Sequence, residues 1–106
     1  MENQIETERK TSFKEIIKIL SEVDDVNFVE NFFNCLLTPA EINDMATRWI
    51  TVKEIEKGTP QREIAKKFHI SLCKITRGSK VLKDPNSAFR KIFDDFEDYS
   101  EFKKRT

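Results

Sequence analysis

Apolar side chains recur at intervals of three and four residues along most of this 106-residue chain. This spacing puts them on one face of an α-helix, whereas a half-buried β-strand would alternate apolar and polar residues, and no segment shows that alternation. The stripes and their flanking cap residues predict about six helices, at 12–23, 26–37, 39–57, 60–68, 72–83 and 86–96, the last ending at 96 or beyond. We therefore expect an all-α fold in one domain covering residues 1–106. In the third helix the residues expected to face inward are Ile42, Met45, Ala46, Trp49, Val52 and Ile55.

Glycine and proline fall where helices should end or begin, with one exception. Gly58 follows an apolar helical run, the usual place of a helix-terminating glycine. Each of the three prolines follows Thr or Asp, as a first-turn proline follows an N-cap residue: Pro39, Pro60 and Pro85. At the start of the third helix, Thr38 and Glu41 fit a capping box. The exception is Gly78, which lies inside the fifth helix, where glycine costs about 0.5–1 kcal/mol relative to alanine.

Composition argues against several classes of protein. No stretch approaches the roughly 20 apolar residues of a membrane span, and the charged N-terminal segment lacks the apolar core of a signal peptide, so we expect a cytoplasmic protein. Cys35 and Cys73 have no metal-ligand spacing and His69 is the only histidine, so we expect reduced thiols and no metal site. Because the sequence offers no paired carboxylates in a plausible cleft, no histidine-centred nucleophile and no phosphate-binding glycine loop, we expect neither an enzyme nor a prosthetic group.

Charge is unevenly distributed although the formal net charge is zero. Residues 58–83 contain seven Lys or Arg and a single acid, Glu63, which is an excess of six positive charges. A basic segment in a balanced chain is typical of a nucleic-acid contact surface. A solvated helix face is the commoner meaning of a charge run, so charge alone leaves both interpretations open.

The stretch "QREIAKKFHISLCKITRGSK" fits the packing pattern of a helix-turn-helix, which we place at about 60–83. Small Ala65 falls where the two helices would cross, and Ser71 opens the second helix. The core between the helices is supplied by Ile64, Phe68, Ile70 and Ile75. Two positions depart from the pattern, because His69 stands in the tight turn where glycine is usual and Gly78 replaces an apolar core residue.

Gly78 admits two interpretations. It can let two backbones approach closely or tolerate a bend, which is the common role of an isolated glycine in a helix. Alternatively, the missing side chain leaves a slot for a small planar ligand. Arg77 lies beside that slot, and a guanidinium can both stack on an aromatic ring and fork onto a carboxylate.

Four stretches, "LLTPAE", "TRW", "QREIA" and "ITRGS", together resemble the tryptophan repressor family of bacterial helix-turn-helix proteins, in the same order and with similar spacing from about Leu36 to Lys83. The resemblance implies an intertwined helical homodimer that binds double-stranded operator DNA and takes free L-tryptophan as corepressor. By the same resemblance, the ligand-binding residues are Cys35, Leu37, Thr38, Arg48, Arg77, Gly78 and Val81. The DNA-binding residues are Gln61, Arg62, Leu72, Cys73, Lys74, Thr76 and Lys83.

The chemistry of these residues suits an amino-acid ligand. Arg77 and the Thr38 hydroxyl can bind the carboxylate, and the backbone carbonyls at Cys35 and Leu37 can accept from the ammonium. Arg48 and Arg77 can stack on the two faces of the indole as cation–π partners.

Some positions depart from the family pattern. Val81 stands where a small residue is usual, Trp49 is large for its position, and Lys80 replaces a common Asn. The turn "GTPQRE" is one residue shorter than in the best-known member.

The leading hypothesis is a tryptophan-dependent repressor of genes for tryptophan biosynthesis or transport. One alternative is a repressor-like DNA-binding protein whose slot is filled by its own Val81 or Trp49, so that it works without tryptophan. Another is a helical protein-interaction module whose basic stripe meets an acidic partner.

Overall fold

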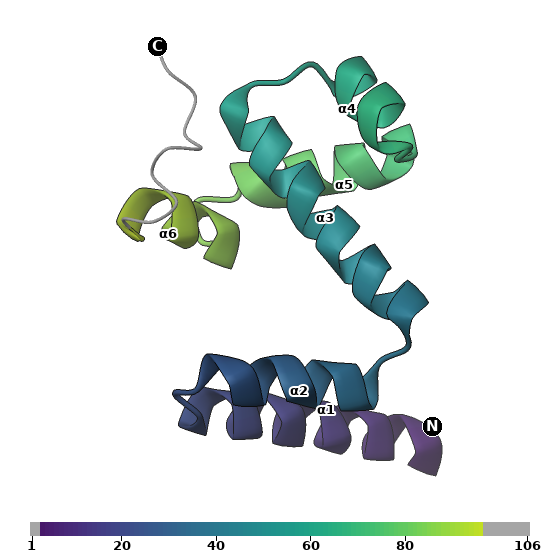
Figure 1. Ribbon diagram of the computed structural model, residues 1–106, viewed down its shortest axis with the longest axis vertical. Helices are drawn as coiled ribbons and strands as arrows, with labels where there is room; N and C mark the ends of the chain where they lie inside the picture. The colour runs from purple at the N-terminus through teal and green to yellow at the C-terminus, as the bar shows by residue number, and fades with distance from the viewer. Residues whose placement is uncertain (1–2, 97–106) are drawn as a thin grey trace. The chain divides into compact units, whose positions relative to one another are not determined.

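The computed structural model describes residues 3–96, and every regular element in this range is an α-helix (Figure 1). The helices are α1 (Gln4–Glu22), α2 (Val26–Leu36), α3 (Pro39–Lys57), α4 (Gln61–Phe68), α5 (Leu72–Lys83) and α6 (Ala88–Asp95). This arrangement confirms the all-α prediction with its six helices over the described residues. A continuation of the last helix past Phe96 would lie outside them. The chain divides into two compact units between Ile42 and Asn43, within α3. The assignment of one domain to residues 1–106 stays a prediction.

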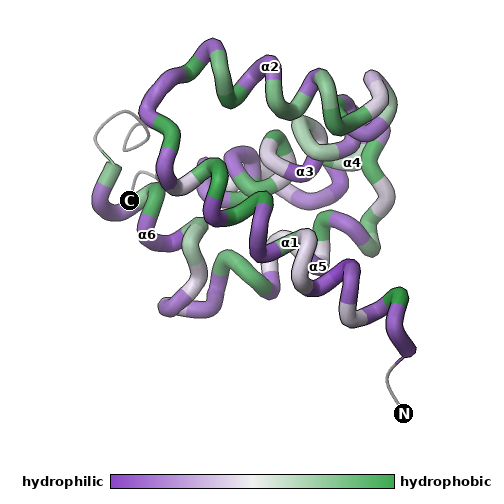
Figure 2. The backbone as a smooth tube through the Cα atoms, turned by 90° about the horizontal axis from the view of Figure 1, so that it is seen from below, coloured by the Kyte–Doolittle hydropathy of each residue, from purple (hydrophilic) through white to green (hydrophobic). Residues whose placement is uncertain are grey.

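The first unit contains α1 and α2, and α1 begins eight residues before the predicted start at residue 12. The early start was missed because residues 4–11 carry no apolar stripe, while Asn3 caps the helix by accepting from the Glu6 N–H at 2.8 Å. Asp25 caps α2 in the same way, accepting from the N–H groups of Asn27 and Phe28. Figure 2 shows hydrophobic residues recurring among hydrophilic ones along both helices.

No residue of α1 or α2 is buried in the single chain. Phe13 is 63% exposed and Val26 is 81% exposed, although both belong to apolar stripes. Isolated exposed apolar residues are normal, but this many on two neighbouring helices are typical of an interaction surface. We call this set the exposed apolar residues of α1 and α2; it consists of Ile5, Phe13, Ile17, Ile19, Val26, Phe28 and Leu36.

The second unit contains the rest of α3 together with α4, α5 and α6. Its first core cluster joins Ile64, Ile70 and Ile75, with Phe68 and half-buried Ala65 packed against it. These are the core residues predicted between the two helices of the basic segment, and their packing confirms that prediction. The second cluster consists of Val52, Leu82 and Phe93, bordered by Trp49, Ile55 and Phe89. Along α3, Met45 and Ala46 were expected to face inward, but both are exposed in the single chain.

Two predicted helix ends are confirmed. Gly58 has φ 91°, and the N–H groups of Gly58 and Thr59 donate to the carbonyls of Ile55 and Glu54, both at 3.0 Å, which ends α3 as expected. At the other end of α3 the capping box forms. The Thr38 N–H donates to Glu41 Oε1 at 2.9 Å, and the Glu41 N–H donates to Thr38 Oγ1 at 3.2 Å.

The prolines are less uniform than predicted. Pro39 is the first residue of α3, as expected, but Pro60 occupies the N-cap position of α4, and Thr59 instead donates to the Glu54 carboxylate at 3.4 Å. Pro85 lies in a turn before α6. There Asp84 accepts from the Asn86 N–H, while Ser87 is the residue that caps the helix. Thr59 and Asp84 were predicted to cap helices and do not, for the same reason: Thr and Asp side chains can also form other local hydrogen bonds, to a turn or to another side chain.

Candidate functional site

The turn between α4 and α5 occupies residues 69–71 and is held by local hydrogen bonds. His69 has φ 55° and ψ 46°, in the left-handed region, and its N–H donates to the Ala65 carbonyl. Histidine is among the residues that enter this region more readily than most, which explains how the turn forms without glycine. Ser71 then caps α5, because its hydroxyl oxygen accepts from the Lys74 N–H at 3.3 Å.

The residues predicted to contact DNA all lie on α4 and α5, and all are exposed: Gln61, Arg62, Leu72, Cys73, Lys74, Thr76 and Lys83. Leu72, an apolar residue, is 52% exposed at the start of α5. The Thr76 hydroxyl donates to the Leu72 carbonyl at 2.9 Å, which leaves its oxygen lone pairs able to accept a further bond. The structure thus places these residues on one pair of helices, and their contact with DNA stays a prediction.

A pocket of about 230 Å³ lies within the second unit, bounded by side chains of α3, α5 and α6 and by Ile70 of the turn. It contains four of the predicted ligand-binding residues: Arg48, Arg77, Gly78 and Val81. The other three, Cys35, Leu37 and Thr38, belong to the first unit and are not among the residues that line this pocket. Their part in ligand binding stays a prediction.

Seven lining residues were not predicted for the ligand: Asp44, Thr47, Thr51, Val52, Ile70, Lys74 and Phe89. Helical spacing could have found Asp44, Thr51 and Val52 on α3, because residues three and four positions from Arg48 share its face, whereas Thr47 is adjacent to Arg48 in the sequence. Lys74 was predicted, but for DNA. Phe89 comes from α6, and no local pattern connects that helix with the pocket.

Gly78 lies where α5 packs against α3. A β-carbon at this position would lie 3.4 Å from Thr51 Cγ2, 3.5 Å from Ile55 Cδ1 and 3.9 Å from Val52 Cγ2. These are ordinary contact distances, so α3 leaves room for a β-carbon at this position and the packing of the two helices does not by itself require glycine. Gly78 also lines the pocket, so the second interpretation stays open.

Four charged side chains line the pocket: Asp44, Arg48, Lys74 and Arg77. None of them has an ion-pair or side-chain hydrogen-bond partner among residues 3–96. Charged groups gathered in one hollow without pairing can bind a ligand without first breaking an internal contact. Three of the four are cations, so the pocket favours a ligand that carries a carboxylate.

The family model for Trp repressor protein matches residues 11–97, a range that includes most of α1 and all of α2 to α6. The chain belongs to the Trp repressor family. It is 35% identical over 79 residues to a Trp operon repressor homolog of Xylella fastidiosa, covering 74% of this chain and 86% of that protein. It is 27% identical over 89 residues to one of Chlamydia trachomatis, covering 83% and 95%. A homolog of Chlamydia caviae is 32% identical over 79 residues, covering 74% and 78%. A comparison with solved structures gave no match.

Val81 and Trp49 were both expected to fill the slot in this member of the Trp repressor family, but only one of them lies at the pocket. Val81 lines the pocket and is half-buried. Trp49 does not line it. Its indole stacks on Phe93, with ring centroids 5.6 Å apart and an interplanar angle of 3°, and it lies 6.1 Å from the Phe89 ring. Of these two residues, only Val81 is therefore placed to narrow the pocket.

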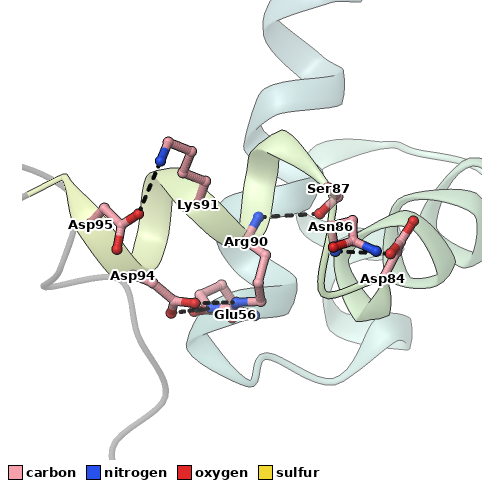
Figure 3. Close-up of polar contacts among 8 residues, drawn as sticks. All are labelled: Glu56, Asp84, Asn86, Ser87, Arg90, Lys91, Asp94 and Asp95. Atoms are coloured by element: carbon pink, nitrogen blue, oxygen red, sulfur yellow. Dashed lines mark hydrogen bonds and ion pairs between the residues drawn. The ribbon is translucent and has the colours of Figure 1, made fainter.

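The wall formed by α6 is fixed to α3 by an ion pair (Figure 3). The Arg90 guanidinium forks onto the buried Glu56 carboxylate, with Nη1 donating to Oε1 at 3.0 Å and Nη2 donating to Oε2. It also contacts Asp94 on its own helix. The hydrogen bonds to Glu56, more than any other cause, raise the pKa of Arg90 above its ordinary value. Together with the stacking of Trp49 on Phe93, this pair positions Phe89 at the pocket.

Within residues 3–96 no three His, Cys, Asp or Glu side chains gather in a way that could hold a metal ion, and both Cys35 and Cys73 are exposed free thiols. None of the helices there combines the length and apolar character needed to cross a bilayer.

Proposed function

We propose that this member of the Trp repressor family is a DNA-binding transcriptional repressor that takes L-tryptophan as its corepressor. One observation carries the proposal, namely that α5 serves two surfaces. Arg77 and Gly78 line the pocket, while the same helix exposes Thr76 and Lys83, neither of which lines it. A ligand in the pocket would therefore touch the helix assigned to DNA. The names of the relatives, Trp operon repressor homolog, favour genes of tryptophan biosynthesis or transport as targets.

The ligand is assigned from the charges and shape of the pocket. Arg77 binds the carboxylate by charge-assisted hydrogen bonds, and the guanidinium groups of Arg77 and Arg48 stack on the indole. The Thr38 hydroxyl also donates to the carboxylate, since in the capping box its oxygen only accepts. The carbonyls of Cys35 and Leu37 accept from the ammonium.

DNA binding is assigned to α4 and α5 as a helix-turn-helix. Arg62, Lys74 and Lys83 neutralise phosphates, while Gln61 and Thr76 reach phosphates or base edges. Leu72 and Cys73 supply apolar or weakly polar contact at the start of the second helix. Each phosphate contact adds to the salt dependence of affinity, so binding should weaken steeply as salt rises.

A homodimer is supported by the apolar surface that α1 and α2 leave exposed in the single chain. Burying it against a second copy removes this apolar surface from water and presents two α5 helices to one duplex. Reading helices of a dimer bind half-sites about 34–36 Å apart. Tryptophan raises operator affinity only if it binds the DNA-competent arrangement better than the alternative one. We place the repressor in the bacterial cytoplasm.

Calorimetry and DNA binding together test this proposal. We expect L-tryptophan to bind the purified wild-type protein and to raise its affinity for operator DNA. Replacing Arg77 by Gln should weaken tryptophan binding at least tenfold in the absence of DNA, since it removes a charge-assisted bond and a stacking surface. Lys66→Gln is the matched control, because Lys66 is exposed on α4 and does not line the pocket.

The DNA half of the proposal has its own variant. Arg62→Gln should weaken DNA binding at every tryptophan concentration and reduce the salt slope by about one, while leaving tryptophan binding in solution unchanged. If calorimetry detects no heat of binding at millimolar tryptophan, and if tryptophan does not change the affinity for DNA, then tryptophan is not the corepressor of this protein.

A second candidate function is a repressor-like protein that binds DNA without any tryptophan ligand. It is favoured by Val81, whose branched side chain lines the pocket at a position where the family usually has a small residue. Val81→Ala separates the two, because a protein that gains tryptophan binding only in this variant has a pocket that its own side chain closes. The third candidate, a protein-interaction module, would be refuted by steeply salt-dependent binding that nonspecific duplex DNA competes for.

A further inference from the structure

Asp44 is the one acidic residue among those that line the charged pocket. It lies on α3, one helical turn before Arg48, and the remaining charged lining residues are the cations Lys74 and Arg77 on α5. The pocket therefore offers a negative group at one position and positive groups at others. Such a distribution matches a ligand that itself carries both charges.

The Asp44 carboxylate makes no ion pair with these cations. Aspartate and arginine four residues apart on a helix often pair, yet no such contact forms between Asp44 and Arg48. Elsewhere in the same unit comparable pairs do form, including Arg90 with Asp94 at the same spacing. The Asp44 carboxylate is thus available to a group from outside the chain.

We propose that Asp44 binds the ammonium group of the ligand and makes the pocket selective for an amino acid over an indole carboxylic acid. The inference rests on the proposed function and adds to it a residue that decides the class of ligand. An indole carboxylic acid would meet the same three cations, but it has no positive group to balance the negative charge of Asp44. The ammonium of an amino acid removes that repulsion and forms a charge-assisted hydrogen bond with the carboxylate.

This role is compatible with the backbone carbonyls assigned to the ammonium. An ammonium group has three N–H donors, so a contact with Asp44 leaves two of them for other acceptors. Only Asp44 among these acceptors carries a charge. It therefore distinguishes charged from neutral or absent amino groups more sharply than a carbonyl can.

The test compares two ligands that differ in the amino group. Calorimetric titrations with L-tryptophan and with indole-3-propionate are made on the wild-type homodimer and on Asp44→Asn. Because Asp44 is exposed, we expect the variant to bind L-tryptophan about fivefold more weakly. It should bind indole-3-propionate as well as the wild type does or more tightly, since a repelling charge is gone. The preference for tryptophan therefore falls.

Two further variants keep this comparison interpretable. Asp44→Glu retains the carboxylate and should keep the preference for L-tryptophan. Glu63→Gln removes one negative charge from the same unit at an exposed position that does not line the pocket, and it should leave both affinities unchanged. If Asp44→Asn changes both ligands in the same direction and by the same factor, the ammonium contact is refuted while the proposed function stands. If the wild type binds neither ligand, the proposed corepressor fails, and this inference with it.

Discussion

Replacing Gly78 by alanine should make the protein more stable and its ligand binding weaker. Gly78 lies inside α5, where alanine is favoured over glycine by about 0.8–1.0 kcal/mol. The added methyl group meets Thr51 and Ile55 at 3.4 Å and 3.5 Å, distances of ordinary contact, so no neighbour has to move. Since the position is half-buried, the methyl group also gains part of the roughly 0.8 kcal/mol of a buried carbon.

These terms add to about 1 kcal/mol or slightly more in the free energy of unfolding. For a chain of this size that corresponds to a rise of about 4–8 °C in Tm. The same methyl group enters the lining of the pocket and should lower the affinity for L-tryptophan. Leucine at this position would be a poorer probe of the ligand, because its extra carbons would overpack the contact with α3 and destabilise the fold by about 1–3 kcal/mol.

Gly58→Ala provides the matched control. That glycine has φ 91°, a conformation that costs alanine about 1–2 kcal/mol, so the same substitution should there lower the stability. Both variants are measured by urea denaturation at one protein concentration, because the stability of an oligomer depends on concentration. A Gly78→Ala protein that is less stable than the wild type would refute the packing argument. Greater stability with unchanged tryptophan affinity would refute the role of Gly78 in the pocket.

Three other predictions concern stability, pH and assembly. Arg90→Met should lower the free energy of unfolding by about 2 kcal/mol because it leaves the buried Glu56 carboxylate unpaired, and the double variant with Glu56→Met should lose less in the same denaturation assay. The pKa of Glu41 lies below its ordinary value of 4.5, chiefly because the Thr38 N–H donates to the carboxylate and then because of the Thr38 side chain. A group whose pKa is lower in the folded chain stabilises the fold at pH values above its pKa in the unfolded chain, and this stabilisation is lost as the pH falls through its pKa in the folded chain. The free energy of unfolding of the wild type should therefore exceed that of Glu41→Gln by less and less between about pH 6 and pH 3. Phe13→Ser should raise the dimer dissociation constant about tenfold or more in sedimentation measurements, and an unchanged constant would exclude Phe13 from the dimer interface.

The fold could be predicted largely because its signals are local. Apolar periodicity located the six helices, and short-range bonds such as those of Ser71 and Thr38 lie where cap residues indicated them. The start of α1 was missed since polar residues continue that helix without an apolar stripe. Met45 was expected to face inward but is exposed, because periodicity shows which face of a helix is apolar and not what covers it.

The site was predictable in part for a related reason. Arg77 and Gly78 stood out as a pair inside one helix, and Arg48 followed from the resemblance to a family. Asp44 was not predicted for the ligand, although it lies on the same face of α3 as Arg48, because neither motif nor resemblance pointed to it. Phe89 could not be predicted, since its place at the pocket depends on how α6 packs on α3 and α5.

The α6 wall of the pocket has a consequence for how such regulators can diverge. A substitution on α5 that alters the ligand site also risks altering the surface assigned to the operator, because both lie on one helix. Phe89 lines the same pocket from a helix that carries none of the proposed DNA contacts. Its position is fixed by the Arg90–Glu56 pair and the aromatic stack and not by anything that reads a base sequence. Residue 89 is therefore where a descendant of this protein could acquire a new ligand without a change in the surface proposed to bind DNA.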